Sequence, residues 1–241
     1  MIMNTDIHYH GPVVALDLDD TLYPEADYVA SAYDAIADAL LRRDNINTAA
    51  SLKVMNRAFR IGHNPFEALL DAFPSIGFKE LFIPMCVEIY RYHTPKISLP
   101  EESREFLTYL RDNGIRAAIV TDGRAVTQWS KIKALSLDEF INPADIWISE
   151  ERGIGKLALN PWRALVNRYP EASSFFAIGD NPAKDFLYPN MLGFTTICLI
   201  DKGRNVHPQN DVPSAAHAPA HRKHSFREIE SLIISAPKNN I

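Results

Sequence analysis

The sequence predicts an α/β protein, a Rossmann-like doubly wound parallel sheet joined to a small all-helical domain. From residue 97 onward, short apolar segments alternate with helical segments, a pattern typical of parallel βα units. By contrast, residues 24–96 carry apolar side chains at helical spacing, and no strand pattern interrupts them. We therefore expect a discontinuous core of residues 11–23 and 97–241, with a helical domain inserted at 24–96.

The first predicted strand, residues 13–16, is apolar and β-branched and is followed directly by acidic residues. In open α/β sheets, ligands bind at the carboxyl ends of the strands. Asp17 and Asp19 can share a hard cation there, Asp17 through its side chain and Asp19 through its carbonyl. The Asp19 carboxyl would then be free for proton transfer. The alternative is that Asp17, Asp19 and Asp20 cap the helix that follows.

Four amphipathic helices are expected in the inserted domain, because its apolar residues recur every three to four positions. Asparagine and proline residues mark where these helices start and stop. These residues are Asn47, Asn64, Pro74 and Pro95.

Two later strands of the core also end in polar residues. Residues 117–120 run into Thr121-Asp122, and residues 175–178 run into Gly179-Asp180. Helices are expected at 124–135 and from Asn160 to Tyr169, with further strands at 145–148 and 194–200. Since parallel strands end at one edge of a sheet, these polar groups are expected to meet there.

Residues 201–223 are rich in Pro, His, Asn and Ala, which predicts a long loop or mobile segment. A short helix should follow, because Ser225 and Glu228 have the spacing of a capping box. The histidines of this segment, at 207, 217, 221 and 224, have no ligand spacing, and we expect no metal site among them.

Composition restricts the class of protein. The net charge is −5 over 241 residues and Lys and Arg are dispersed, so nucleic acid is not an expected partner. No apolar run is long enough for a membrane span, and the first ten residues lack the pattern of a secretory signal. We expect a cytoplasmic protein in which Cys86 and Cys198 are buried thiols. The sequence carries no signal for the oligomeric state.

The polar residues at these strand ends resemble, in chain order, the four motifs of the haloacid dehalogenase (HAD) superfamily of phosphohydrolases. The likeness extends from residue 13 to about residue 200. The helical insert resembles the mobile cap of the subgroup that carries its cap after the first motif. The matching elements are Asp17-Leu18-Asp19-Asp20-Thr21, Thr121, Lys156, and Gly179-Asp180 with Asp185.

The resemblance implies a covalent mechanism. Asp17 would be the nucleophile that forms an aspartyl-phosphate, and Asp19 would protonate the leaving alcohol and later deprotonate water. That role favours a pKa for Asp19 closer to neutrality than that of a free aspartate. Mg²⁺ would be bound by Asp17, the Asp19 carbonyl and Asp180, with support from Asp185.

The resemblance also implies a phosphate-binding set of Thr121, Asp122 and Lys156, completed by backbone N–H groups near Leu18, Asp19 and Asp122. Taken alone, Thr121 could be a helix cap and Lys156 a surface lysine. Leu157 follows Lys156 where relatives often have proline. Asp122 stands where many relatives have asparagine, and its charge would favour a substrate hydroxyl.

These implications favour a Mg²⁺-dependent phosphatase acting on a small phosphorylated metabolite, either a sugar phosphate or a nucleoside monophosphate. The dehalogenases of the superfamily lack an acid two residues after the nucleophile, so Asp19 favours phosphate esters over carbon–halogen bonds. Two alternatives stay open: a phosphotransferase that uses the same aspartyl-phosphate, and a non-catalytic binding protein on the same scaffold.

Overall fold

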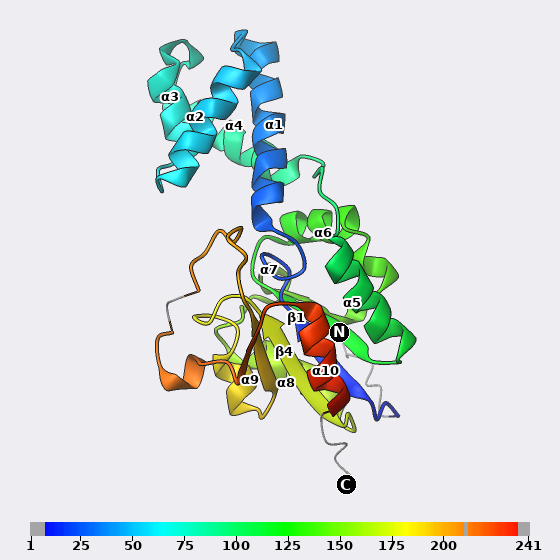
Figure 1. The fold of residues 1–241 in the computed structure, drawn as a ribbon. Coiled ribbons are helices and arrows are strands. Elements are labelled where there is room, and N and C mark those ends of the chain that lie inside the picture. The colour runs from blue at the N-terminus through cyan, green and yellow to red at the C-terminus, as the bar shows by residue number, and fades with distance from the viewer. Residues whose placement is uncertain (1–7, 210–211, 236–241) are drawn as a thin grey trace. The chain divides into compact units, whose positions relative to one another are not determined.

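A computed structural model describes residues 8–209 and 212–235 of the chain (Figure 1). The chain divides into two compact units. Met1–Ala26 together with Ser98–Ile241 form the core unit, and Asp27–Ile97 form the helical unit. The predicted insert at 24–96 starts three residues earlier and ends one residue earlier than the helical unit.

The core unit is built on a six-stranded, fully parallel sheet in the order β3-β2-β1-β4-β5-β6, which confirms the predicted fold class. β1 lies between β2 and β4, where the strand order reverses, and ligand sites of doubly wound sheets lie at this point. The strands are β1 (Pro12–Leu16), β2 (Arg116–Thr121), β3 (Ile146–Ile148), β4 (Ser174–Gly179), β5 (Thr195–Leu199) and β6 (His221–Lys223).

Helices cover both faces of the sheet, as its buried and largely apolar strands require (Figure 1). On one face, Trp162 and Leu165 of α8 (Leu159–Arg168) pack against Val13 and Ala177. On the other, α5 (Glu101–Asp112) and α10 (Phe226–Ser235) pack together, with stacked rings of Phe106 and Phe226 at 4.5 Å. The remaining core elements are α6 (Ala125–Ala134), α7 (Ser149–Arg152), α9 (Leu187–Met191) and the 3₁₀ turns Leu137–Glu139, Pro143–Asp145 and Ala215–His217.

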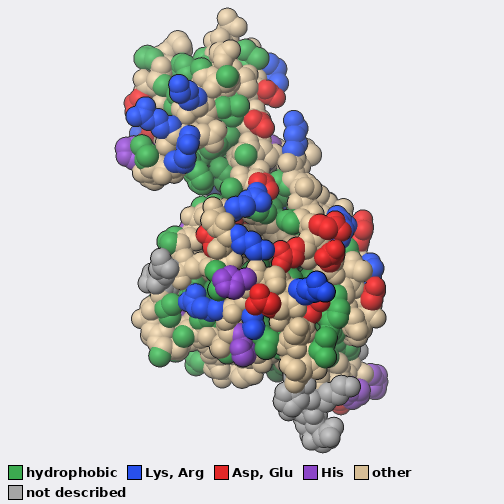
Figure 2. All heavy atoms as spheres, in the orientation of Figure 1, with side chains coloured by type: hydrophobic (Ala, Val, Ile, Leu, Met, Phe, Trp, Pro, Cys, Tyr) green, Lys and Arg blue, Asp and Glu red, His purple; other side chains and the backbone are tan. Residues whose placement is uncertain are grey.

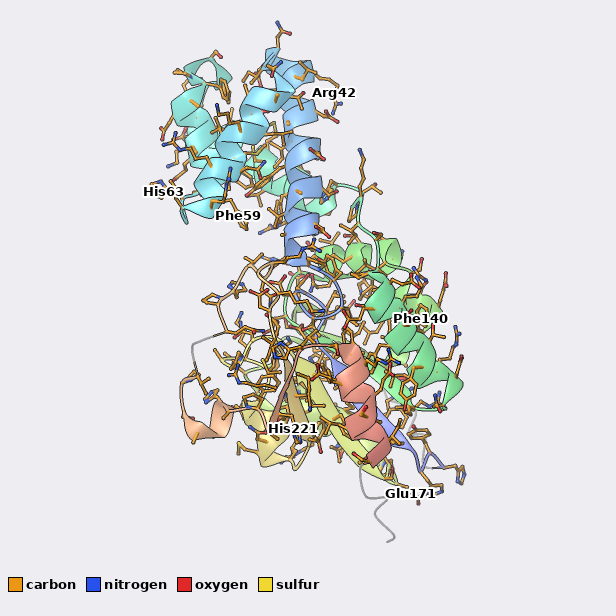
Figure 3. All side chains as sticks on the ribbon, viewed as in Figure 1. Arg42, Phe59, His63, Phe140, Glu171 and His221 are labelled. Atoms are coloured by element: carbon orange, nitrogen blue, oxygen red, sulfur yellow. The ribbon has the colours of Figure 1, made fainter. Side chains whose placement is uncertain are left out.

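The helical unit has the predicted four helices around an apolar core of its own. Asn47 and Asn64 cap the second and third helices by accepting backbone N–H groups, as expected from the sequence. Phe59 lies near the end of the second helix, with its ring centroid 6.3 Å from that of Tyr33 (Figure 3). The elements are α1 (Glu25–Asp44), α2 (Thr48–Arg60), α3 (Pro65–Ala72), the 3₁₀ turn Pro74–Ile76 and α4 (Lys79–Tyr92).

The segment after β5 differs from the prediction of a structureless loop. His221 lies in β6, which pairs in parallel with β5 (Figure 3). This strand is only three residues long and strongly polar, so it has none of the apolar pattern that identifies a strand. Half of the capping box expected at Ser225 is confirmed, since the Ser225 hydroxyl accepts the Glu228 N–H at 3.3 Å. The Glu228 carboxylate accepts from the same hydroxyl at 3.4 Å.

The described residues can be compared with what the composition predicts for membrane spans, surface charge and cysteines. Within the described residues, no helix is long and apolar enough to cross a membrane. Acidic and basic side chains are interspersed over the face drawn in Figure 2. Cys86 and Cys198 are both buried and unpaired, as expected.

Candidate active site

The parallel register brings the polar strand ends together at one edge of the sheet. Asp17 follows β1, Thr121 ends β2 and Asp180 follows β4. The Asp17 N–H donates to the Ile178 carbonyl, which continues the pairing of β1 with β4 one residue beyond β1. The predicted site residues all line one cavity of about 100 Å³ within the core unit. Its lining is Asp17, Asp19, Asp20, Glu25, Thr121, Asp122, Lys156, Asp180, Asn181, Lys184, Asp185 and His207.

Lys156 is a buried cation that lines this cavity, with a side chain only 4% exposed. Its Nζ lies 2.6 Å from Asp17 Oδ1 and 2.8 Å from Asp185 Oδ1. Burial alone would lower the pKa of Lys156, but the two carboxylates raise it well above its ordinary value. Lys156 is therefore charged at all physiological pH values, and it is not a surface lysine.

Asp122 positions the backbone of Lys156. Its Oδ1 accepts the Lys156 N–H at 2.9 Å. A Cβ on Gly155 would lie 2.5 Å from the same oxygen, so glycine permits this close approach. This contact occupies one oxygen of the Asp122 carboxylate, and the expectation that its charge favours a substrate hydroxyl stays a prediction.

Asp17, Asp180 and Asp185 form a cluster whose carboxylate oxygens lie within 4.8 Å of one another. Burial raises the pKa of Asp17 well above its ordinary value despite Lys156, and the neighbouring carboxylates add to the increase. Burial, Asp185 and Asp20 raise the pKa of Asp180 to about 7. Three carboxylates and one ammonium leave a formal charge of −2, which a divalent cation would neutralise. Hard oxygen donors of this kind suit Mg²⁺.

Asp185 is held in place from three sides. Its Oδ1 accepts from Lys156, and its Oδ2 accepts the Asn181 N–H at 2.8 Å. A Cβ on Gly179 would lie 2.3 Å from Asp185 Oδ2, closer than any real contact allows. The glycine of Gly179-Asp180 therefore serves to let the Asp185 carboxylate lie against the backbone.

Asp19 is bound by three side chains. Lys131 Nζ lies 2.8 Å from both of its carboxylate oxygens, Tyr23 donates to Oδ1 at 2.6 Å, and Gln128 donates to Oδ2 at 3.0 Å. Burial would raise the pKa of Asp19, but Lys131 and these hydrogen bonds lower it below its ordinary value. The expectation of a pKa closer to neutrality was wrong for this arrangement, because the sequence did not reveal the lysine.

The structure can be compared with the alternative, stated above, that Thr121 and the acidic residues after β1 serve only as helix caps. The Thr121 hydroxyl is buried and accepts from Gln128 at 2.7 Å, so the same amide contacts both Thr121 and Asp19. Asp20 does cap a helix, since its Oδ1 accepts the N–H of Glu25 at the start of α1. Asp17 and Asp19 bind lysines instead. The Leu18 N–H, expected in the phosphate cradle, donates to Asp17 Oδ1.

Sequence reasoning missed several side chains of the site. Gln128 and Lys131 lie on the buried face of α6, the helix that follows Thr121. Their spacing of one helical turn, which places both side chains on one face, was the available signal for a polar contact with the site. Asn205 and Gln209 contact Asp180 from the loop after β5, where no sequence pattern marks them.

Comparison with known proteins identifies the family of the chain. A family model described as haloacid dehalogenase-like hydrolase matches residues 12–187, which includes every predicted site residue. The chain belongs to the haloacid dehalogenase-like hydrolases. The predicted superfamily and its hydrolase class are thereby confirmed.

Two curated relatives of this HAD-like hydrolase match most of the chain. One, from Methanocaldococcus jannaschii, is 26% identical over 204 residues, which cover 82% of this chain and 88% of the relative. Another, from Methanopyrus kandleri, is 27% identical over 213 residues with the same coverage of each chain. Both are named glyceraldehyde 3-phosphate phosphatase.

Solved structures share the fold of this HAD-like hydrolase at lower identity. The HAD hydrolase YfnB of Bacillus subtilis, solved with magnesium, superimposes with a TM-score of 0.63 at 19% identity, covering 93% of this chain and 99% of its own. A 2-haloacid dehalogenase from Pseudomonas syringae gives 0.59 at 18% identity, with 93% and 98% coverage. These similarities show the fold alone.

Proposed function

We propose that this chain is a Mg²⁺-dependent phosphatase that hydrolyses a small phosphomonoester through an aspartyl-phosphate on Asp17. The observation that carries the proposal is the position of the Asp17 carboxylate. Lys156 lies on one side of it, Asp180 and Asp185 lie within 4.8 Å, and Asp19 follows two residues later. An anionic nucleophile, a carboxylate cluster that could hold an ion and a second acid in one cavity support this proposal.

In the first step, a carboxylate oxygen of Asp17 attacks phosphorus and the bond to the leaving alcohol breaks. Lys156 offsets the charge that would otherwise repel a phosphate dianion from Asp17, and Thr121 offers a hydroxyl at the end of β2. Mg²⁺ held by Asp17, the Asp19 carbonyl and Asp180, with Asp185 in support, would neutralise the remaining charge and stabilise the transferring phosphoryl group.

Asp19 moves the protons in both steps. Asp19 must carry a proton when the first step begins. It donates this proton to the leaving alcohol oxygen and becomes ionised, and it then regains a proton from the water that hydrolyses the aspartyl-phosphate. The contact with Lys131 favours the ionised form of Asp19, which the second step requires. The helical unit is proposed to serve as a cap, as the resemblance implies.

The proposed substrate is a small sugar phosphate. Support comes from the curated relatives named glyceraldehyde 3-phosphate phosphatase, which match four-fifths of the chain. The acid at position 19 favours an ester whose leaving alcohol needs a proton, as opposed to a halide. Glyceraldehyde 3-phosphate is therefore the first compound to test, followed by other sugar phosphates and nucleoside monophosphates.

The test is phosphate release from such a panel with Mg²⁺, with Asp17→Asn as the inactive control. We expect turnover of a sugar phosphate by the wild type and none by Asp17→Asn, whose circular dichroism spectrum should be unchanged. Transfer of phosphate to an added sugar acceptor in preference to water would indicate a phosphotransferase instead. Binding of Mg²⁺ without turnover of any phosphomonoester would contradict the enzymatic proposal.

A further inference from the structure

The loop after β5, residues Asp201–Gln209, is held together by internal hydrogen bonds. Asp201 Oδ1 accepts the backbone N–H groups of Gly203, Arg204 and Asn205 at 2.7, 2.8 and 3.1 Å. Gln209 Oε1 accepts the Asp201 N–H at 2.8 Å, so the two ends of the loop are joined. This Asp201–Gln209 loop therefore has a defined shape despite its polar sequence.

The Asp201–Gln209 loop is attached to the active site at both Asp20 and Asp180. The Val206 N–H donates to Asp20 Oδ2 at 2.6 Å. The Gln209 side chain donates to the Asp180 carbonyl at 2.8 Å, and the Asn205 side chain donates to Asp180 Oδ2 at 2.8 Å. Asp180 is thus bound by the loop through its backbone and its side chain.

The contact with Asn205 bears on the orientation of the Asp180 carboxylate. The terminal torsion of an aspartate is broad, so a carboxylate without a partner samples many orientations of its plane. A hydrogen bond to Oδ2 restricts that plane, and Asp180 also offers a carboxylate oxygen to the cluster with Asp17 and Asp185. Partners of this kind are generally important for metal affinity, because they pre-organise the ligand.

We propose that Asn205 is a positioning residue for Asp180, and that the Asp201–Gln209 loop is an outer layer of the Mg²⁺ site. The proposal rests on the proposed function, since it requires Mg²⁺ at Asp180. It predicts a reciprocal coupling: Asn205 strengthens Mg²⁺ binding, and Mg²⁺ stabilises the loop. A loop that only shields the edge of the sheet would have neither effect.

Calorimetric titration of the full chain with Mg²⁺ tests the first half of this coupling, with no substrate present. Asn205→Ala should bind Mg²⁺ about 10- to 100-fold more weakly than the wild type. Lys202→Ala is the matched control from the same loop, because the ion pair of its ammonium is with Glu102. It should bind Mg²⁺ as the wild type does. Asn205→Ser provides a second variant should Asn205→Ala fold poorly.

Hydrogen exchange tests the second half. Mg²⁺ should slow exchange of the Gly203–Val206 amides in the wild type and in Lys202→Ala, but not in Asn205→Ala. If both Asn205 variants bound Mg²⁺ with wild-type affinity, the positioning role of Asn205 would be overturned, but the proposed function would not. Equal weakening in Lys202→Ala would also overturn the positioning role, since any loop change would then suffice. Absence of Mg²⁺ binding by the wild type would overturn the metal site of the proposed function as well.

Discussion

Lys131 Nζ lies 2.8 Å from each carboxylate oxygen of Asp19, and both side chains are largely buried. The lysine comes from α6, more than one hundred residues further along the chain, and the same helix contributes Gln128 to the carboxylate. An acid proposed to exchange protons with substrate and water is therefore paired with a cation that favours its ionised form.

Replacing Lys131 should change the pH dependence of turnover. In Lys131→Met, burial of Asp19 persists while the opposing charge is lost, so the pKa of Asp19 rises. Hydrolysis of the aspartyl-phosphate needs ionised Asp19, and the acidic limb of the kcat profile should move to higher pH. At acidic pH, kcat should approach the roughly 100-fold loss expected without general base catalysis. Lys133→Met, on the exposed side of the same helix, should leave the profile unchanged. An unchanged limb in Lys131→Met would contradict the role of this pair.

The contact of Asp122 with Lys156 predicts different effects for two substitutions. Asp122→Asn keeps an oxygen that can accept the Lys156 N–H, and its kcat/KM should remain near the wild-type value. Asp122→Ala removes the acceptor, at a cost of about 0.5–1.5 kcal/mol, which corresponds to roughly a 2- to 10-fold loss in kcat/KM. Steady-state kinetics of both variants measure this difference. Equal losses in the two would mean that the charge of Asp122, and not its hydrogen bond, is what matters.

The substitution Gly179→Ala tests whether the Asp185 carboxylate must lie against the backbone at position 179. A methyl group at this position would displace the Asp185 carboxylate from Lys156 and from the Asn181 N–H. Gly179→Ala should lower kcat/KM by about 100-fold, because small displacements of catalytic groups have effects of this size. In the background of Asp185→Ala, the same substitution should add little. Additive losses in the double variant would show that the glycine acts by another route.

Mg²⁺ should stabilise the protein more at alkaline than at acidic pH. The folded, metal-free protein has a pKa of about 7 at Asp180, above the ordinary 3.8, so the stabilisation from this proton is lost as pH rises through 7. Mg²⁺ competes with that proton for the Asp180 carboxylate, and it therefore binds better at pH values above this pKa. At 100 times Kd, Mg²⁺ adds about 2.7 kcal/mol to the free energy of unfolding.

For a chain of this size, that free energy corresponds to an increase in Tm of roughly 5–10 °C. Thermal unfolding at about pH 5.5 and pH 8, with and without Mg²⁺, measures the effect. Asp180→Asn should reduce the pH dependence of the metal-free Tm but retain part of it, since burial and Asp19 raise the pKa of Glu25 to about 7 as well. A larger Mg²⁺ effect at the lower pH would contradict the assignment of Asp180 as a ligand.

Much of the fold was predictable because its signals are local. The apolar strands before Asp17, Thr121 and Asp180 are identified by composition, and the caps at Asn47 and Asn64 by the side-chain chemistry of helix starts. β6 escaped prediction because an edge strand of three polar residues has no hydrophobic period.

The candidate site was predictable only as far as its motifs extend. Motif spacing identified Asp17, Lys156 and Asp185, which the structure brings together. Lys131, which favours the ionised form of Asp19, and Asn205, which contacts the Asp180 carboxylate, come from segments far away in sequence. Such contacts depend on the three-dimensional packing of α6 and the Asp201–Gln209 loop, and a single sequence does not encode them in any local pattern.

The central claim is that Asp17 carries the phosphoryl group during turnover, and trapping the acyl phosphate tests it most directly. Enzyme mixed with excess substrate and Mg²⁺ is quenched in acid, and borohydride then reduces any aspartyl-phosphate to homoserine. Peptide mass spectrometry should locate homoserine at position 17 in the wild type and at no position in Asp17→Asn. Full turnover with an unmodified Asp17, or modification at a different carboxylate, would contradict the proposed mechanism.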